Sequence, residues 1–318
     1  MDIGWLVGVL LYPGFAFVST LALFFEWVDR RLYARMQNRF GPIYTGPYGI
    51  LQPLADLVKL LTKEDIAPRT VDRALYTLTP FLTLSTSLLA TLFLPIAGYE
   101  GLLSFEGDLV VVVALLTIIC ILTFLAGVSS WNRFSVMGAE RAAMQLLGYE
   151  VPLMLSVIGA GISAGSLSLS GVVRYQASHG WLIAGPGALG LALLVVASQA
   201  ELERLPFDIP EAEQELVAGW LTEYSGRKLA LFRLARDVEM VLLAGLGATL
   251  FLGGPHAPLL PEALAPLVFT LKALAVLFLL TLMRAIFARF RIDQMLEVSW
   301  RLLIPLAVLY VVIARVMY

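Results

Sequence analysis

The sequence predicts an all-α membrane protein, a polytopic bundle of about eight transmembrane helices that forms one membrane domain over residues 1–318. Its 318 residues are 59% hydrophobic and only 14% charged, whereas an average soluble domain is about 45–50% apolar and about 25% charged. The apolar residues also stand in runs of about 20, the length that crosses the hydrocarbon core of a bilayer. Lys and Arg, in turn, gather in alternate connecting segments.

The apolar runs predict where each span lies. The first continues to Phe25 without a small-residue cleavage site, so we interpret it as a span rather than a cleaved signal peptide. The sixth is short, and its helix can begin as early as Leu229. The eight expected spans are residues 3–25, 75–97, 108–128, 139–165, 181–200, 238–253, 265–287 and 297–316.

The basic residues predict the orientation. Of the 22 Lys and Arg residues, 19 fall in the four alternate segments 27–74, 129–141, 201–237 and 284–301. Because Lys and Arg are retained on the cytoplasmic side, these segments are expected to face inward. The sequence therefore predicts a multi-pass protein of the cell inner (plasma) membrane with both termini on the outer side.

The first inner segment is expected to be structured. Gly41-Pro42 and Gly46-Pro47 are turn signals. From Leu51 to Lys63 apolar residues recur at helical spacing among polar ones, which predicts an amphipathic helix. The pattern leaves open whether that helix lies at the membrane interface or packs against a partner protein.

Metal and redox chemistry are not expected in this chain alone. Cys120 is the single cysteine and lies inside an apolar run, so the sequence offers no thiolate cluster. His179 and His256 are far apart and are expected in loops. We therefore predict no metal site, no cofactor bound by this chain alone, no nucleic-acid partner, and redox centres carried by other subunits.

The segment 201–223 differs from the rest of the chain in its acidity. Only Arg204 offers a counter-charge within it. Asp208 is predicted to cap a short helix whose first turn holds Pro210 and Glu211. The seven carboxylates of the segment are Glu201, Glu203, Asp208, Glu211, Glu213, Glu215 and Glu223.

Two interpretations of this acidic segment remain open. Glu211 and Glu215 stand four residues apart and would repel each other on one helix if both were ionised. Closely spaced acids raise one another's pKa in a low-dielectric setting, so some would hold protons and act as a proton relay. A solvated inner loop would tolerate the same acids at little cost.

Glu150 favours the relay. If its span enters the membrane near Ala139, Glu150 lies about 16 Å along the helix, roughly at mid-membrane, where a carboxylate is rare and functional by default. A hydrogen bond to a neighbouring helix is the structural alternative. The charged residues near or within later spans are further stations: Asp237, Glu239, Lys272 and Arg284. A carboxylate is one candidate partner for Lys272, and the sequence does not show which residue it pairs with.

The basic stretch after the first span has two interpretations, a membrane anchor and a docking face. Arg31, Arg35 and Arg39 follow one another at a spacing of four, which predicts one guanidinium-rich helix face. Such a face anchors the inner side of the membrane, and it equally suits docking to an acidic partner or an anionic head group.

Several motifs together identify a family. They are Arg30-Arg31 with Ala34-Arg35-Met36-Gln37 and Gly41-Pro42, Gln52-Pro53-Leu54-Ala55-Asp56 with Lys63-Glu64-Asp65, Gly138-Ala139-Glu140-Arg141 with Tyr149-Glu150-Val151, Pro206-Phe207-Asp208-Ile209-Pro210-Glu211-Ala212-Glu213 with Glu223-Tyr224-Ser225-Gly226, and Arg289, Arg291, Asp293-Gln294 and Trp300. The chain resembles the H-type membrane subunit of respiratory complex I (NADH:quinone oxidoreductase) and its relatives in membrane-bound hydrogenase-type complexes, over nearly its whole length.

The resemblance implies a membrane subunit of an ion-translocating oxidoreductase that has no redox centre of its own. It would form much of a quinone chamber beneath a hydrophilic arm, whose iron–sulfur and hydrogenase-like subunits are its partners along with small membrane subunits and antiporter-like subunits. The resemblance assigns the acidic entry of a proton path to Glu140, Glu150, Glu201, Asp208, Glu211, Glu213, Glu215 and Glu223. It assigns the chamber mouth or docking face to Arg30, Arg31, Arg35, Arg39, Gln52 and Asp56.

Other functions stay open on the sequence. Glu203, Leu205 and Ala288 stand where the complex I pattern has Asn, Ala and Pro, so a non-quinone relative linked to ferredoxin and to hydrogen or sulfur chemistry is an alternative. A stand-alone proton-coupled transporter fits the intramembrane charges, although no internal repeat supports it. A passive membrane anchor for a soluble enzyme is the third class.

Overall fold

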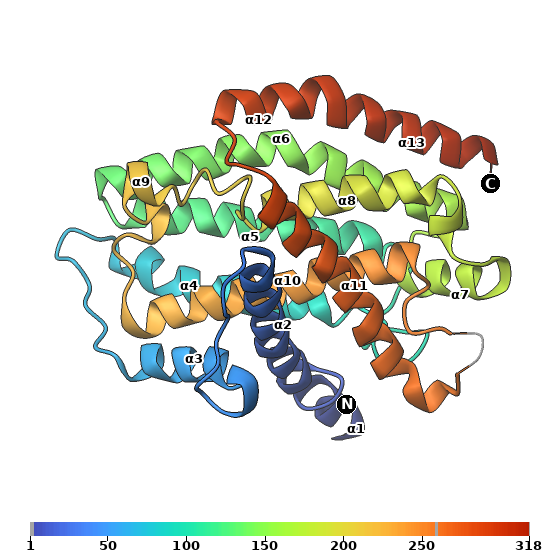
Figure 1. Cartoon of the computed structure of the whole chain (residues 1–318), viewed down its shortest axis with the longest axis horizontal. Coiled ribbons are helices and arrows are strands. Elements are labelled where there is room, and N and C mark those ends of the chain that lie inside the picture. The colour runs from blue at the N-terminus through green and yellow to red at the C-terminus, as the bar shows by residue number, and fades with distance from the viewer. Residues whose placement is uncertain (1–2, 258–259, 318) are drawn as a thin grey trace.

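The computed structural model describes residues 3–257 and 260–317, apart from the side chains of Ile3, Trp5 and Glu213. In this part of the chain every regular element is a helix, which confirms the predicted fold class (Figure 1). The long helices are α2 (Phe15–Met36), α4 (Arg73–Thr91), α5 (Asp108–Ser129), α6 (Arg133–Ala164), α8 (Gly187–Glu201), α10 (Gly226–Phe251) and α11 (Ala265–Ile286). The shorter ones are α1 (Ile3–Leu10), α3 (Gln52–Thr62), α7 (Leu169–His179), α9 (Glu213–Leu216), α12 (Ile292–Val298) and α13 (Ile304–Met317).

Five helical segments are long and apolar enough to cross a membrane. They are Leu6–Met36, Asp108–Ser129, Arg133–Ala164, Glu262–Ile286 and Ile292–Met317. The other three predicted spans are also helical. Of these, α8 has only 15 residues, and α10 carries several charges in its first half. The count of eight spans therefore stays a prediction.

Helix α10 is the centre of the bundle. Every residue from Val238 to Phe251 is buried, as expected for a helix that is apolar all round. It packs against α2, α4, α8 and α11, and Figure 1 shows it crossing the middle of the molecule behind α2 and α11. Its start at Gly226 confirms that the sixth predicted span begins before residue 238.

The predicted first span, residues 3–25, has the wrong boundaries. The chain breaks between α1 and α2 at residues 11–14, because Pro13 has no N–H with which to continue a helix. The second helix then runs to Met36. As a result, Glu26, Asp29 and Arg30 belong to the helix itself rather than to a connecting loop, and they face the other helices.

The structure also corrects the expected surroundings of Lys272 and of His179. No carboxylate of the described residues pairs with Lys272: its ammonium donates to the carbonyl of His256 at 2.6 Å and lies over the Trp181 ring, 4.7 Å from the centroid. This contact joins α11 to the connection that follows α10. His179 is not in a loop but ends α7, where its ring stacks on Tyr175.

The amphipathic helix of the first inner segment is confirmed as α3. Pro53 and Leu60 are buried against the bundle, where α3 contacts α2 and α10. Leu54, Val58 and Leu61 are exposed at helical spacing on another face. That exposed stripe suits a lipid interface and a partner protein equally well.

Candidate functional site

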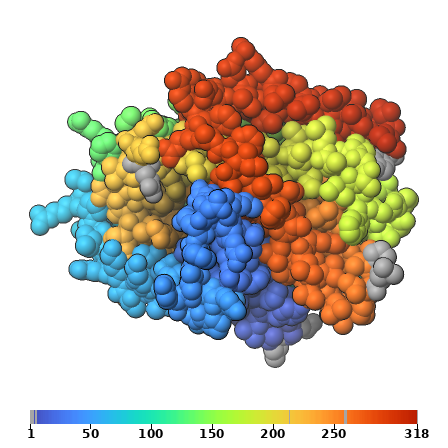
Figure 2. All heavy atoms as spheres, in the orientation of Figure 1, coloured from blue at the N-terminus to red at the C-terminus, as the bar shows by residue number. Residues whose placement is uncertain are grey.

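A cavity of about 580 Å³ opens where α2, α10 and α11 meet the segment after α8. These four parts of the chain come together on one face of the molecule, with α2 at the centre of the view in Figure 2. Most of the lining is charged. The charged residues that line it are Glu26, Arg30, Glu203, Arg204, Asp208, Glu211, Arg233, Arg236, Asp237, Arg284 and Arg289.

Asp29 lies beside this cavity, fully buried on α2. Its carboxylate accepts hydrogen bonds from the Thr281 hydroxyl at 2.7 Å, Arg284 Nη1 at 2.8 Å and Arg204 Nη1 at 3.2 Å. Charge-assisted bonds of this kind are the strong ones. The cluster joins α2, α11 and the segment after α8, and therefore fixes one wall of the cavity.

A second chain of polar contacts runs from α2 to α3. Arg30 bonds Glu26 and, through Nη1, Asp56 Oδ2 at 2.7 Å. Gln52 Nε2 donates to the other Asp56 oxygen at 3.0 Å. Burial alone would raise the pKa of Asp56, but the hydrogen bonds from Arg30 and Gln52 outweigh it and hold that pKa below its usual range. The structure thus brings together Arg30, Gln52 and Asp56.

The predicted guanidinium face is confirmed for Arg31 and Arg35, which both belong to α2, but not for Arg39. Arg31 lies between the rings of Trp27 and Tyr48, at 5.4 and 5.2 Å from their centroids. Arg35 is exposed near the end of α2. Arg39 follows the end of that helix at Met36 and is therefore off its face. A docking role for these residues stays a prediction.

The acidic segment is held by arginines from elsewhere in the chain. Asp208 does not cap a helix: both of its oxygens accept hydrogen bonds from Arg289, which offers a planar fork of donors. Helix α9 begins only at Glu213, so Glu211 and Glu215 do not share a helix face. The predicted repulsion between them is therefore wrong.

Glu211 and Glu215 have opposite environments. Glu215 is exposed and accepts a hydrogen bond from Arg141 at 2.6 Å, and this bond with the Arg141 charge lowers its pKa. Glu211 pairs with Arg236 at 3.2 Å. Loss of hydration raises the pKa of Glu211 in spite of that partner, with Glu203 nearby adding to the shift. Of the two, Glu211 is the group suited to take up a proton.

Arg236 occupies the junction between the cavity and the interior. Its guanidinium bonds Glu203 at 2.8 Å and the Leu202 carbonyl at 3.1 Å, and it lies over the Trp220 ring. Trp220 Nε1 donates to the same Glu203 oxygen at 2.9 Å. Glu203 holds a left-handed backbone (φ 48°), which is costly for a residue other than glycine and is retained where the surroundings require it.

A small buried pocket of about 20 Å³ lies on the inner side of Arg236. Glu201, Glu239, Tyr149 and Cys120 line it and are all buried. The Tyr149 hydroxyl and the Glu239 carboxyl lie within hydrogen-bonding reach of Glu201. A space of this size with several polar partners is large enough for one water. The sequence singles out Glu201 and Glu239 separately, but not Tyr149, which looks like an ordinary core aromatic residue.

The remaining predicted proton-path residues whose side chains the structure describes do not line this pocket. Glu150 follows Tyr149 on α6, is half-buried and accepts a hydrogen bond from Thr117 on α5. Glu223 accepts one from Asn132, away from the pocket lining. Glu140 is exposed and lines neither cavity. The side chain of Glu213 lies outside the described part of the structure.

Comparison with known proteins identifies the scaffold that carries these two cavities. The family model described as NADH dehydrogenase matches residues 9–315. The chain belongs to the NADH dehydrogenase family. Among its relatives, the H-type subunit of the NADH-quinone oxidoreductase of Thermomicrobium roseum is 38% identical, with 96% of this chain and 93% of that protein covered.

Two further relatives are similar to this chain over nearly its whole length. The H-type subunit numbered 2 of the NADH-quinone oxidoreductase of Geobacter sulfurreducens is 40% identical, with 94% of this chain and 92% of that protein covered. The H-type subunit numbered 1 of the same enzyme in Rhodopseudomonas palustris is also 40% identical, with 96% and 95% covered. The likeness therefore includes the spans, α3 and the acidic segment alike.

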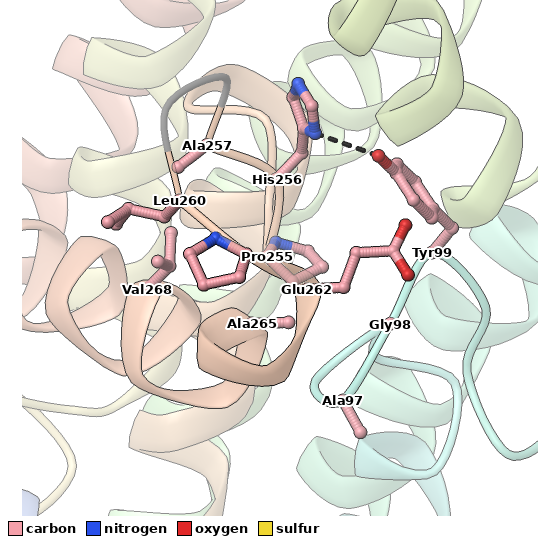
Figure 3. Close-up of a pocket in the computed structure, with 11 residues that line it drawn as sticks. Ala97, Gly98, Tyr99, Pro255, His256, Ala257, Leu260, Glu262, Ala265 and Val268 are labelled. Atoms are coloured by element: carbon pink, nitrogen blue, oxygen red, sulfur yellow. Dashed lines mark hydrogen bonds between the residues drawn. The ribbon is translucent and has the colours of Figure 1, made fainter.

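A third cavity, of about 280 Å³, lies at the other end of α10 in this NADH dehydrogenase family member. Figure 3 shows His256 facing Tyr99, with Glu262 on the same side. The His256 Nδ1 to Tyr99 oxygen distance is 2.9 Å. None of the predicted site residues lines it. Among the residues that the structure describes, no group of three His, Cys, Asp or Glu side chains is placed to hold a metal ion.

The Asp56 contacts give a pH-dependent prediction. Because the pKa of Asp56 is lowered on folding, the stability from its carboxylate is complete above its unfolded pKa of about 3.9, and it is lost as the pH falls through the folded value. Asp56→Asn is therefore expected to lower the melting temperature at neutral pH, and this difference from wild type should begin to shrink only below about pH 3.9 and disappear below the folded pKa. Thermal unfolding of the detergent-solubilised protein across this range measures it, with the exposed Glu64→Gln as control. An equal effect at all pH values would contradict the assignment.

Proposed function

We propose that this chain is the membrane subunit through which a complex I-type NADH:quinone oxidoreductase couples quinone chemistry to proton movement. The observation that carries the proposal is the pair of adjoining cavities: a large charged cavity, and behind it a small buried pocket with two carboxyls. The names of its relatives support the quinone, since all three reported are subunits of NADH-quinone oxidoreductases.

The large cavity suits a quinone head group as substrate. Its volume of about 580 Å³ lies within the range of ordinary ligand pockets. Quinone carbonyls accept hydrogen bonds, and the cavity wall offers guanidinium donors from Arg30, Arg233 and Arg289. This chain holds the head group near ionisable side chains, and iron–sulfur clusters on partner subunits would supply the electrons.

The buried pocket suits the first proton-holding station inside the membrane. Two carboxyls that approach each other away from water cannot both ionise at low cost, so Glu201 and Glu239 together retain a proton. Tyr149 contacts Glu201, and Glu150 is the next residue on the same helix. We propose that protons from the cavity reach Glu201 and then cross α6 by way of Glu150 toward antiporter-like partners.

Glu201→Gln tests this function in the assembled complex. In inverted membrane vesicles, the number of protons translocated per electron is expected to fall at least about tenfold, as for loss of a proton-transfer group. Electron transfer from NADH to a short-chain quinone and assembly of the complex are measured alongside. Glu297→Gln is the matched control, because Glu297 is exposed and its ion pair among the described residues is with the exposed Arg301. Normal proton translocation by an assembled Glu201→Gln complex would refute the proposal.

Purification of the native protein separates this function from the other classes. We expect the chain to copurify with an iron–sulfur arm that oxidises NADH. A ferredoxin-oxidising arm with a nickel–iron site would favour the non-quinone relative instead. A chain that is stable alone and free of iron–sulfur partners would be a transporter.

A further inference from the structure

We propose that Arg236 is a positioning residue that controls proton passage from the charged cavity to the Glu201–Glu239 pocket by exchanging one carboxylate partner for another. This inference rests on the proposed function and adds to it the element that separates the two cavities. It is carried by the placement of Arg236 between acids on both of its sides.

Arg236 belongs to the walls of both cavities. Only three other residues, Glu203, Trp220 and Phe232, line both cavities as the structure describes them. The Arg236 side chain is about one fifth exposed and points into this junction, with Trp220 beneath its guanidinium. A proton that moves from one cavity to the other therefore passes this cation, which repels it unless the cation is neutralised or moves aside.

The present partners of Arg236 both line the large cavity, and one of them, Glu203, also lines the small pocket. They are Glu203 at 2.8 Å and Glu211 at 3.2 Å. Three acids thus share one cation, because Glu239 stands three residues after Arg236 on α10 and within its electrostatic reach. Residues three apart on a helix are neighbours, so a change of side-chain rotamer brings the guanidinium from Glu203 to Glu239 without backbone movement.

Protonation of the cavity-side acids supplies the reason for that change. When a proton from cavity water neutralises Glu203, the ion pair with Arg236 is lost and Glu239 becomes the better partner. Arg236 then favours Glu239 as a carboxylate, and the proton of Glu239 passes to the Glu201 carboxylate. Transfer of the Glu203 proton to Glu239 and return of Arg236 to Glu203 restore the starting state of those three residues, and release of the proton from Glu201 toward α6 completes the cycle. The net result is one proton moved from the cavity through Glu201 toward α6.

Three variants in the assembled complex test the proposal. Arg236→Gln is expected to lower the protons translocated per electron at least about tenfold. Arg236→Lys keeps the charge and should recover part of that loss. The double variant Glu203→Gln with Arg236→Gln removes both members of the shorter ion pair, so residue 203 no longer carries an unpaired charge, while Glu211 loses its Arg236 partner in the single and the double variant alike. The double variant should assemble and still translocate poorly.

The double variant distinguishes control of proton passage by Arg236 from simple balance of the Glu203 charge. If Arg236 serves only to balance the Glu203 charge, the double variant translocates protons within about twofold of wild type, and the proposal is wrong. Recovery by Arg236→Lys gives a second measurement, because a merely space-filling role for this side chain would not require the charge. Normal translocation by the single Arg236→Gln variant, beside a defective Glu201→Gln complex, would overturn the Arg236 role and leave the proposed function standing.

Discussion

Replacement of Asp29 by Ala is expected to prevent accumulation of the folded protein, or to lower its stability by about 3–5 kcal/mol, the cost of breaking a buried ion pair from one side. Asp29 is fully buried and has Arg204 and Arg284 as its cationic partners. Its loss leaves both guanidinium groups beside an empty volume in the helix bundle. Thr281 also loses its acceptor on Asp29.

The measurement for Asp29 combines membrane accumulation with the thermal unfolding of solubilised complex. Asp29→Asn keeps the side-chain shape and one acceptor oxygen, so its effect should be smaller than that of Asp29→Ala. Glu297→Ala is the control, because its partner Arg301 is 80% exposed and exposed pairs contribute little. Equal stability of Asp29→Ala and Glu297→Ala would show that the buried cluster does not hold the cavity wall.

Gly138→Ala is expected to cost about 1–3 kcal/mol, typical of overpacking in a dense core, and to impair proton translocation with it. A Cβ at this position on α6 would lie 2.6 Å from the Trp220 backbone nitrogen and 2.9 Å from Gly219. Both neighbours are backbone, so a change of rotamer cannot relieve the contact. The segment that carries Trp220 would be displaced from α6, and the Trp220 bond to Glu203 would be lengthened or lost.

Gly98→Ala is the matched control for Gly138→Ala, because a Cβ at Gly98 meets nothing within 4 Å. The two variants are compared by melting temperature and by protons translocated per electron. We expect Gly98→Ala to match wild type in both. An unchanged Gly138→Ala protein would mean that the acidic segment is not held against α6 as closely as the structure shows.

The sequence predicts the helices of this protein well, because apolar runs and basic connections are local features. It also predicts the amphipathic α3 and the presence of Glu150 within a span. The sequence-based predictions are wrong where a residue that fits a local pattern instead contacts a residue far away in the sequence. Asp208 fits a helix cap by its neighbours, yet Arg289, 81 residues away, offers it two charge-assisted bonds.

The candidate site shows the same limit. Arg236 and Glu203 are 33 residues apart, and no spacing rule joins an arginine on one helix to an acid that follows another. In the sequence, Asp29 directly precedes Arg30 and Arg31, and this basic stretch is interpreted as a membrane anchor. Only the packing of α2 against α11 and the segment after α8 shows that Asp29 is a buried carboxylate with three partners from those two segments.

The continuous burial of α10 from Val238 to Phe251 has a consequence for how charge would cross the membrane. From Met240 to Phe251 this helix carries no ionisable side chain, so beyond Glu239 it offers a proton no acceptor. Under the proposed function, a proton that reaches Glu201 therefore leaves sideways through α6, parallel to the membrane plane. Such a displacement does little work against the membrane potential, so the electrogenic steps would fall to the neighbouring subunits that receive the proton.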